Sequence, residues 1–166
     1  RPTGTSTVLI VQLDLGQPPD DALVLLRDRL DACGVSGDPV IAMPGDDRSA
    51  ARLTELREAV PAAVNALVAA AKAVHADIQK TAGDLIVPFG RLGESLALYR
   101  DAFERRGLDY AIWGHASDGN LHPNVIPKSL DDVTKGREAI DEMARGAMAM
   151  GGAPLAEHGV GRSALK

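Results

Sequence analysis

The chain has 166 residues, enough for one well-buried domain and too few for two of ordinary size. Its formal net charge is −5 and its Lys and Arg residues form no cluster, so a surface that binds nucleic acid through phosphates is not expected. Apolar residues make up 45% of the chain and aromatic residues only 3%, so the core must be mainly aliphatic.

The N-terminal part predicts two short strands separated by a helix. Residues 7–13 form a β-branched apolar run that ends at a glycine and two prolines, which is typical of a buried strand. Two aspartates can cap a helix over residues 20–33, where apolar side chains follow helical spacing and Cys33 is expected to be a small buried filler. Residues 39–43 predict the second strand.

Helix-forming residues continue from about residue 50 to residue 80. Pro61 lies within this stretch and cannot donate a backbone hydrogen bond. The pattern therefore allows either two helices or one bent helix with its break near Val60.

The remaining elements alternate between strands and helices. Strands are expected at residues 84–88, 110–113 and 121–126, and helices at residues 91–106 and 131–150. The second and third of these strands should form a hairpin-like pair. The order predicts an α+β fold, a mostly antiparallel sheet with helices packed on one face in ferredoxin-like units.

The single cysteine excludes an internal disulfide and favours a reducing compartment, so we expect the cytoplasm, with attachment to the periphery of the inner membrane left open. No apolar run approaches the roughly 18 to 20 residues that span a bilayer, and no signal peptide is recognisable. The chain begins without methionine and stops just after a motif. It is therefore expected to be a piece of a longer protein.

Three of the four histidines lie in two glycine-flanked motifs, GHASDGNLHPN at residues 114–124 and EHGVG at residues 157–161. Each histidine alone could be a structural residue that hydrogen-bonds to a nearby carbonyl. Together, however, His115, His122 and Glu157 offer the nitrogen and oxygen ligands of a catalytic divalent metal with an open coordination position. The motifs therefore predict a metal-assisted redox site.

These motifs resemble the C-terminal domain of FAD-linked 2-hydroxy acid dehydrogenases, a family that includes glycolate oxidase subunits, D-lactate dehydrogenases and D-2-hydroxyglutarate dehydrogenases. The resemblance extends upstream through residues 56–58 and 80–88, and so covers most of the chain. Ser117 stands where the family commonly has glycine, and Ala156 occupies the small-residue position before the glutamate. Neither departure removes a ligand.

The resemblance implies a role for each matching position. His115, His122 and Glu157 would bind the metal, and His158 would act as the base. Asn124 would lie against the substrate, and Arg57 and Lys80 would hold the substrate carboxylate, with Lys72 as the alternative to Lys80. Gly159 and Gly161 would contribute to cofactor binding.

The same resemblance implies the cofactors and partners. FAD would be bound mainly by a separate N-terminal domain, and the divalent metal would be zinc, with iron and manganese as alternatives. The substrate would be a small 2-hydroxy acid, and a homo-oligomer or an electron-acceptor subunit is a further expected partner. The chain is expected to be one substrate- and metal-binding domain over residues 1–166, inactive in isolation. Two other interpretations remain open, a zinc-dependent hydrolase and a non-catalytic interaction module stabilised by a metal.

Overall fold

The computed structural model describes residues 7–13, 19–35 and 39–157 of the chain. Contacts divide the chain into two compact units, Arg1–Ala59 and Val60–Lys166. Helix α2 begins in the first unit and ends in the second. The candidate site belongs to the second unit.

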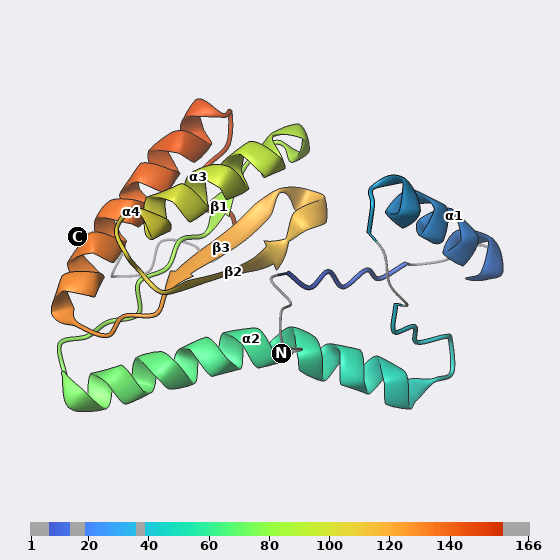
Figure 1. The fold of residues 1–166 in the computed structure, drawn as a ribbon, viewed down its shortest axis with the longest axis horizontal. Coiled ribbons are helices and arrows are strands. Elements are labelled where there is room, and N and C mark those ends of the chain that lie inside the picture. Colours follow the sequence, from blue (N-terminus) through green and yellow to red (C-terminus); the bar gives the residue numbers. More distant parts are fainter. Residues whose placement is uncertain (1–6, 14–18, 36–38, 158–166) are drawn as a thin grey trace. The chain divides into compact units, whose positions relative to one another are not determined.

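The second unit is built on a three-stranded antiparallel sheet with the strand order β1-β3-β2 (Figure 1). Its strands are β1 (Leu85–Ile86), β2 (Tyr110–His115) and β3 (Asn120–Val125). Strand β3 is central and pairs with both neighbours, and all six of its residues are buried. The middle of the sheet is therefore the best-shielded part of the site region.

Two helices, α3 (Leu92–Glu104) and α4 (Leu130–Ala149), lie together on one face of this sheet (Figure 1). A short 3-10 turn, η1 (Phe89–Arg91), leads into α3. The hydrophobic core between helices and sheet consists of fully or almost fully buried side chains, among them Leu85, Tyr99, Phe103, Val125 and Met143. The predicted α+β fold, with an antiparallel sheet and helices on one face, is confirmed.

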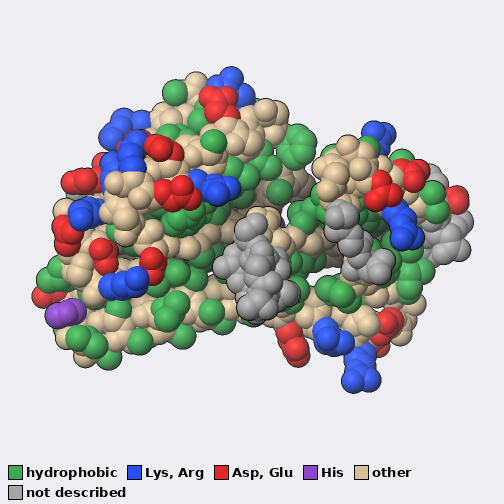
Figure 2. All heavy atoms as spheres, viewed as in Figure 1, with side chains coloured by type: hydrophobic (Ala, Val, Ile, Leu, Met, Phe, Trp, Pro, Cys, Tyr) green, Lys and Arg blue, Asp and Glu red, His purple; other side chains and the backbone are tan. Residues whose placement is uncertain are grey.

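Ion pairs link charged side chains on the exposed sides of α3 and α4. Glu142 on α4 accepts from both Arg105 and Arg106 at the end of α3. These hydrogen bonds, the Arg105 contact first, lower the pKa of the Glu142 carboxyl from its ordinary value. On the face seen in Figure 2, basic and acidic side chains are interspersed over these helices.

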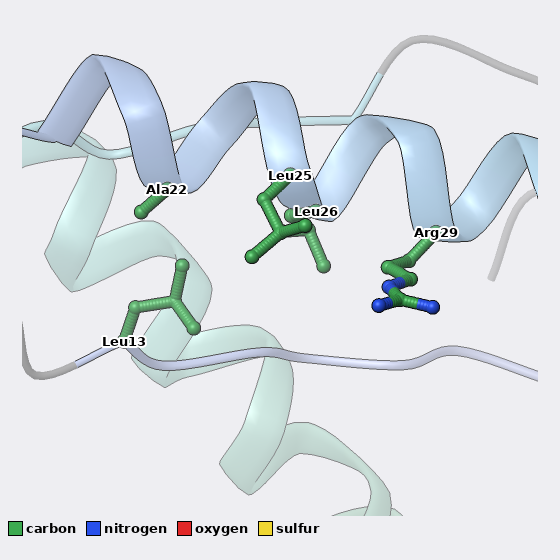
Figure 3. A pocket seen from close by; sticks show the side chains of 5 residues that line it. All are labelled: Leu13, Ala22, Leu25, Leu26 and Arg29. Atoms are coloured by element: carbon green, nitrogen blue, oxygen red, sulfur yellow. The ribbon is translucent and has the colours of Figure 1, made fainter.

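The first unit contains α1 (Pro19–Ala32) and the start of α2 (Asp47–Val74). Figure 3 shows a pocket in which Leu13 faces Ala22, Leu25 and Leu26 of α1, with Arg29 at one end. Leu13 and Leu25 remain 43% and 58% exposed, so this apolar contact is only partial.

Two predicted strands are wrong. Residues 7–13 and 39–43 have no strand structure, and their large apolar side chains are exposed, from 38% at Ile10 to 70% at Val40. A strand needs a partner that completes its backbone hydrogen bonds, and within the described residues neither segment pairs with one. Cys33 is also exposed, which contradicts the expected buried filler.

The other predicted elements are present with shifted ends. The stretch that contains Pro61 forms one continuous helix, α2, so the alternative of two helices is wrong. This helix ends at Val74, earlier than expected, and the strand expected at residues 84–88 is only two residues long. No helix in the described ranges is long and apolar enough to cross a bilayer.

Candidate functional site

The hairpin of β2 and β3 positions two of the three predicted metal ligands. His115 is the last residue of β2 and His122 the third residue of β3, and the turn between the strands is the 3-10 helix η2 (Ala116–Asp118). The rings of His115 and His122 lie edge to face with their centroids 6.2 Å apart. A tight turn thus brings together histidines separated by six residues.

Two glycines are required for this hairpin to close. Gly119 ends the turn in the left-handed conformation with φ at 72°, and a Cβ there would clash with the backbone carbonyl of Val87. Gly114 has φ at 151°, and a Cβ there would clash with the carbonyl of Asn120. Both glycines therefore allow backbone contacts that other residues would prevent.

One face of β3 carries the polar side chains of the site. Side chains alternate along a strand, so Asn120, His122 and Asn124 share the face opposite to that of Leu121 and Val125, which belong to the core. Asn120 and Asn124 are each 1% exposed and His122 is 8% exposed. Burial of polar side chains costs free energy unless hydrogen bonds replace those lost to water.

The segment after α4 returns along β1 and delivers the third ligand. Ile86 and Ala153 form an antiparallel bridge with reciprocal backbone hydrogen bonds of 3.0 and 2.9 Å. The backbone N–H groups of Ala156 and Glu157 then donate to Asp84 Oδ2, at 3.2 and 2.7 Å. These contacts hold Glu157 beside the histidine hairpin.

The three predicted ligands converge. Glu157 Oε1 lies 3.7 Å from His115 Nε2, and Glu157 Oε2 lies 3.9 Å from His122 Nε2. One potential ligand atom from each of the three residues falls within 4.8 Å of the others. This arrangement is a three-ligand cluster of two imidazoles and one carboxylate.

The cluster is slightly wider than the geometry that a divalent ion needs. An ion with ligands at about 2.0 to 2.2 Å would hold the ligand atoms roughly 3 to 3.5 Å from one another, so modest side-chain rotation would close the site. The side chains of His115 and Glu157 are 42% and 44% exposed, whereas that of His122 is 10% exposed. The cluster therefore combines one buried histidine with two side chains that are accessible to solvent.

Asp84 is a site residue that the sequence analysis did not single out. It is 7% exposed, its Oδ2 accepts the two backbone hydrogen bonds described above, and its Oδ1 lies 3.4 Å from His122 Nδ1. The register that pairs Leu85 with Leu121 also sets Asp84 opposite His122. The available signal was an acidic residue directly before a buried strand.

Asn124, the predicted substrate residue, is held close to His122. Its Nδ2 donates a 2.8 Å hydrogen bond to the backbone carbonyl of His122, while its Oδ1 has no hydrogen-bond partner within the described residues. Both polar atoms of the Asn120 side chain likewise have none there. These buried amides can accept or donate toward a ligand on the polar face of β3.

The two predicted cations are both exposed side chains. Lys80 is exposed and donates a 3.0 Å hydrogen bond from Nζ to Asn65 Oδ1 on α2. Arg57 is exposed on the part of α2 that belongs to the first unit. His158, Gly159 and Gly161 lie outside the described residues.

Comparison with known proteins identifies the family. Residues 8–165 match the model of the C-terminal domain of FAD-linked oxidases. The chain is 27% identical over 163 residues to the glycolate oxidase subunit GlcD of Bacillus subtilis, an alignment that covers 96% of this chain and 32% of that protein. It is 30% identical over 94 residues to a probable mitochondrial D-lactate dehydrogenase of Danio rerio, covering 55% of this chain and 19% of that protein.

The chain thus spans about a third of the length of the glycolate oxidase subunit. The match to the family model runs over almost every residue, including both histidine motifs. The chain belongs to the family of C-terminal domains of FAD-linked oxidases, a family of flavin-dependent oxidoreductases.

Proposed function

We propose that this chain is the substrate- and metal-binding domain of an FAD-dependent dehydrogenase of small 2-hydroxy acids, of the glycolate, D-lactate or D-2-hydroxyglutarate type. The observation that supports the proposal is the convergence of His115, His122 and Glu157 within 4.8 Å, in a chain whose relatives include a glycolate oxidase subunit. FAD would be bound mainly by an N-terminal domain of the same protein.

The donor set fits a divalent metal. Two neutral imidazoles and one carboxylate suit zinc, iron or manganese, and we favour zinc because all three ligands are compatible with a four-coordinate site. A bound ion would act as a Lewis acid that lowers the pKa of the substrate hydroxyl. The chain's own contribution is to hold three ligands on one side and leave the other side open.

His158 is the proposed base that accepts the hydroxyl proton. Side chains of neighbouring residues in a regular strand face opposite ways, so Glu157 and His158 can serve one site only in an irregular loop, which Gly159 and Gly161 allow. Once His158 has accepted the hydroxyl proton, the hydride on the carbon that bears this hydroxyl can pass to the flavin of the N-terminal domain.

Substrate orientation is assigned to three further residues. Asn124 Oδ1, which has no hydrogen-bond partner among the described residues, can accept a hydrogen bond from the substrate on the polar face of β3. Arg57 and Lys80 are the proposed cations for the carboxylate. Lys80 can take this role only if it releases Asn65.

The test is metal analysis of the purified protein, with zinc affinity measured by competition against a chromogenic chelator. Wild-type protein is expected to bind about one zinc ion per chain. The His122→Ala variant removes the buried ligand. It should weaken zinc binding by at least about 10- to 100-fold, because loss of a residue that only hydrogen-bonds to a metal ligand already has an effect of this size.

The matched control is His75→Ala, because His75 is exposed and lies outside the cluster. It should bind zinc as the wild type does. Turnover of glycolate and D-lactate is then measured in a protein that also contains the FAD domain, with and without chelator. The proposal would be contradicted by a wild-type protein that binds no metal and whose turnover of 2-hydroxy acids does not change when a chelator is added.

A further inference from the structure

Asp84 contacts two of the three proposed metal ligands, which come from distant parts of the chain. His122 is on β3 and Glu157 follows α4, 35 residues later by their numbers. The carboxylate of Asp84 faces the His122 ring through Oδ1 and the Glu157 backbone N–H through Oδ2. Asp84 therefore contacts the side chain of one proposed ligand and the backbone of another.

The chemistry of this contact determines which nitrogen of His122 carries a proton. An ionised carboxylate only accepts hydrogen bonds, so the nitrogen that faces it, Nδ1, is the one that should be protonated. In a neutral imidazole the other nitrogen, Nε2, then keeps its lone pair. Nε2 is the atom that faces Glu157, at 3.9 Å.

We propose that Asp84 is a positioning residue that fixes the Nδ1-protonated tautomer of His122 and fastens Glu157 beside it, so that both are preset as ligands. This inference rests on the proposed metal site. The inference adds to that site a residue that orients two of its ligands. A carboxylate that accepts a hydrogen bond from a coordinating histidine fixes the orientation of the ring and raises the basicity of the nitrogen that binds the metal.

A purely structural role for Asp84 would be to accept the backbone hydrogen bonds of Ala156 and Glu157. The Asp84→Asn substitution separates the two roles, because the side-chain oxygen of asparagine can still accept both backbone N–H groups. Its NH₂ group would then face His122 Nδ1 and would favour the opposite tautomer, with the proton on Nε2.

The experiment uses the metal-free 166-residue chain and nitrogen-15 NMR of its four histidine rings, assigned by single His→Gln variants. Wild-type His122 is expected to carry its proton on Nδ1, and in Asp84→Asn it should carry it on Nε2. Zinc affinity of the variant should fall by about 10- to 100-fold. Asp109→Asn, at an exposed aspartate paired with Lys128, is the matched control and should change neither.

Each outcome has a defined meaning. A proton on Nε2 of wild-type His122 overturns the inference without any variant, as does an Asp84→Asn protein with a normal circular dichroism spectrum, unchanged tautomer and unchanged zinc affinity. If the Asn variant does not fold, the wild-type tautomer still decides. A proton on Nδ1 in a chain that binds no zinc supports the contact between Asp84 and His122 and overturns the proposed metal site instead.

Discussion

Two short apolar runs, residues 84–88 and residues 7–13, have similar sequences and different structures. Leu85 of the first run is 1% exposed, pairs with Leu121 across the sheet and packs under α3 and α4. Leu9 of the second run is 65% exposed and lies in a segment without strand structure. Apolar, β-branched composition alone therefore does not make a strand, which also needs a paired neighbour and a covering layer.

The same substitution in both runs is expected to give the largest contrast. Leu85→Ala should lower the free energy of unfolding by about 2 to 5 kcal/mol, because it leaves a cavity in the core. Leu9→Ala should change it by no more than about 0.5 kcal/mol, as at other exposed positions. Denaturant unfolding followed by far-ultraviolet circular dichroism measures both, because helices of both units contribute to the signal. An equal cost at Leu9 would show that residues 7–13 are buried in the protein in solution.

Two glycines with nearly identical backbone conformation give a smaller contrast. Gly119 and Gly34 have φ of 72° and 71°, but only Gly119 is pressed against other backbone, that of Val87. Gly34→Ala should cost about 1 to 2 kcal/mol from the left-handed conformation alone. Gly119→Ala should cost roughly 1 to 3 kcal/mol more because the backbone must shift.

Hydrogen exchange of the amides of β2 and β3 tests this difference. Protection of these strands should fall in Gly119→Ala and stay unchanged in Gly34→Ala. Equal effects of the two substitutions on the sheet would mean that the close contact between Gly119 and Val87 is absent.

The smallest effect concerns alkaline stability. Burial raises the pKa of Tyr99 from 10.0 to about 12. The unfolded chain therefore loses this proton first, so the contribution is complete below pH 10 and is lost as the pH rises from 10 to 12. Tyr99→Phe should flatten the decline of unfolding free energy over this range. Tyr99 and Trp113 are in the same unit, so unfolding followed by Trp113 fluorescence should report this loss of stability. An identical decline in the variant would contradict the burial of Tyr99.

Local pattern was sufficient to predict most of the second unit. Helices α3 and α4 follow from apolar spacing and glycine stops, and α4 begins with a capping box formed by Ser129 and Asp132. The hairpin and the convergence of His115, His122 and Glu157 follow from two motifs whose composition suits no ordinary core. These features depend on residues close in sequence or on chemistry that few other patterns share.

What could not be predicted depends on contacts between distant segments. Asp84 gains its importance from lying opposite His122 in the sheet and from the return of residues 153–157 along β1, neither of which leaves a periodic signal. Lys80 was assigned by resemblance, yet its hydrogen bond to Asn65 depends on where α2 ends. All the assigned roles stay predictions: those of the metal ligands His115, His122 and Glu157, and those of Arg57, Lys80, Asn124, His158, Gly159 and Gly161.

The buried polar face of β3 has a consequence for protein engineering. Asn120 and Asn124 occupy positions where aliphatic side chains would be the more stable choice, since their amides are shielded from water and incompletely hydrogen-bonded within the described residues. A search for thermostable variants should therefore select apolar replacements at both positions. Because Asn124 is proposed to contact the substrate, a screen of such variants should measure substrate binding as well as the melting temperature.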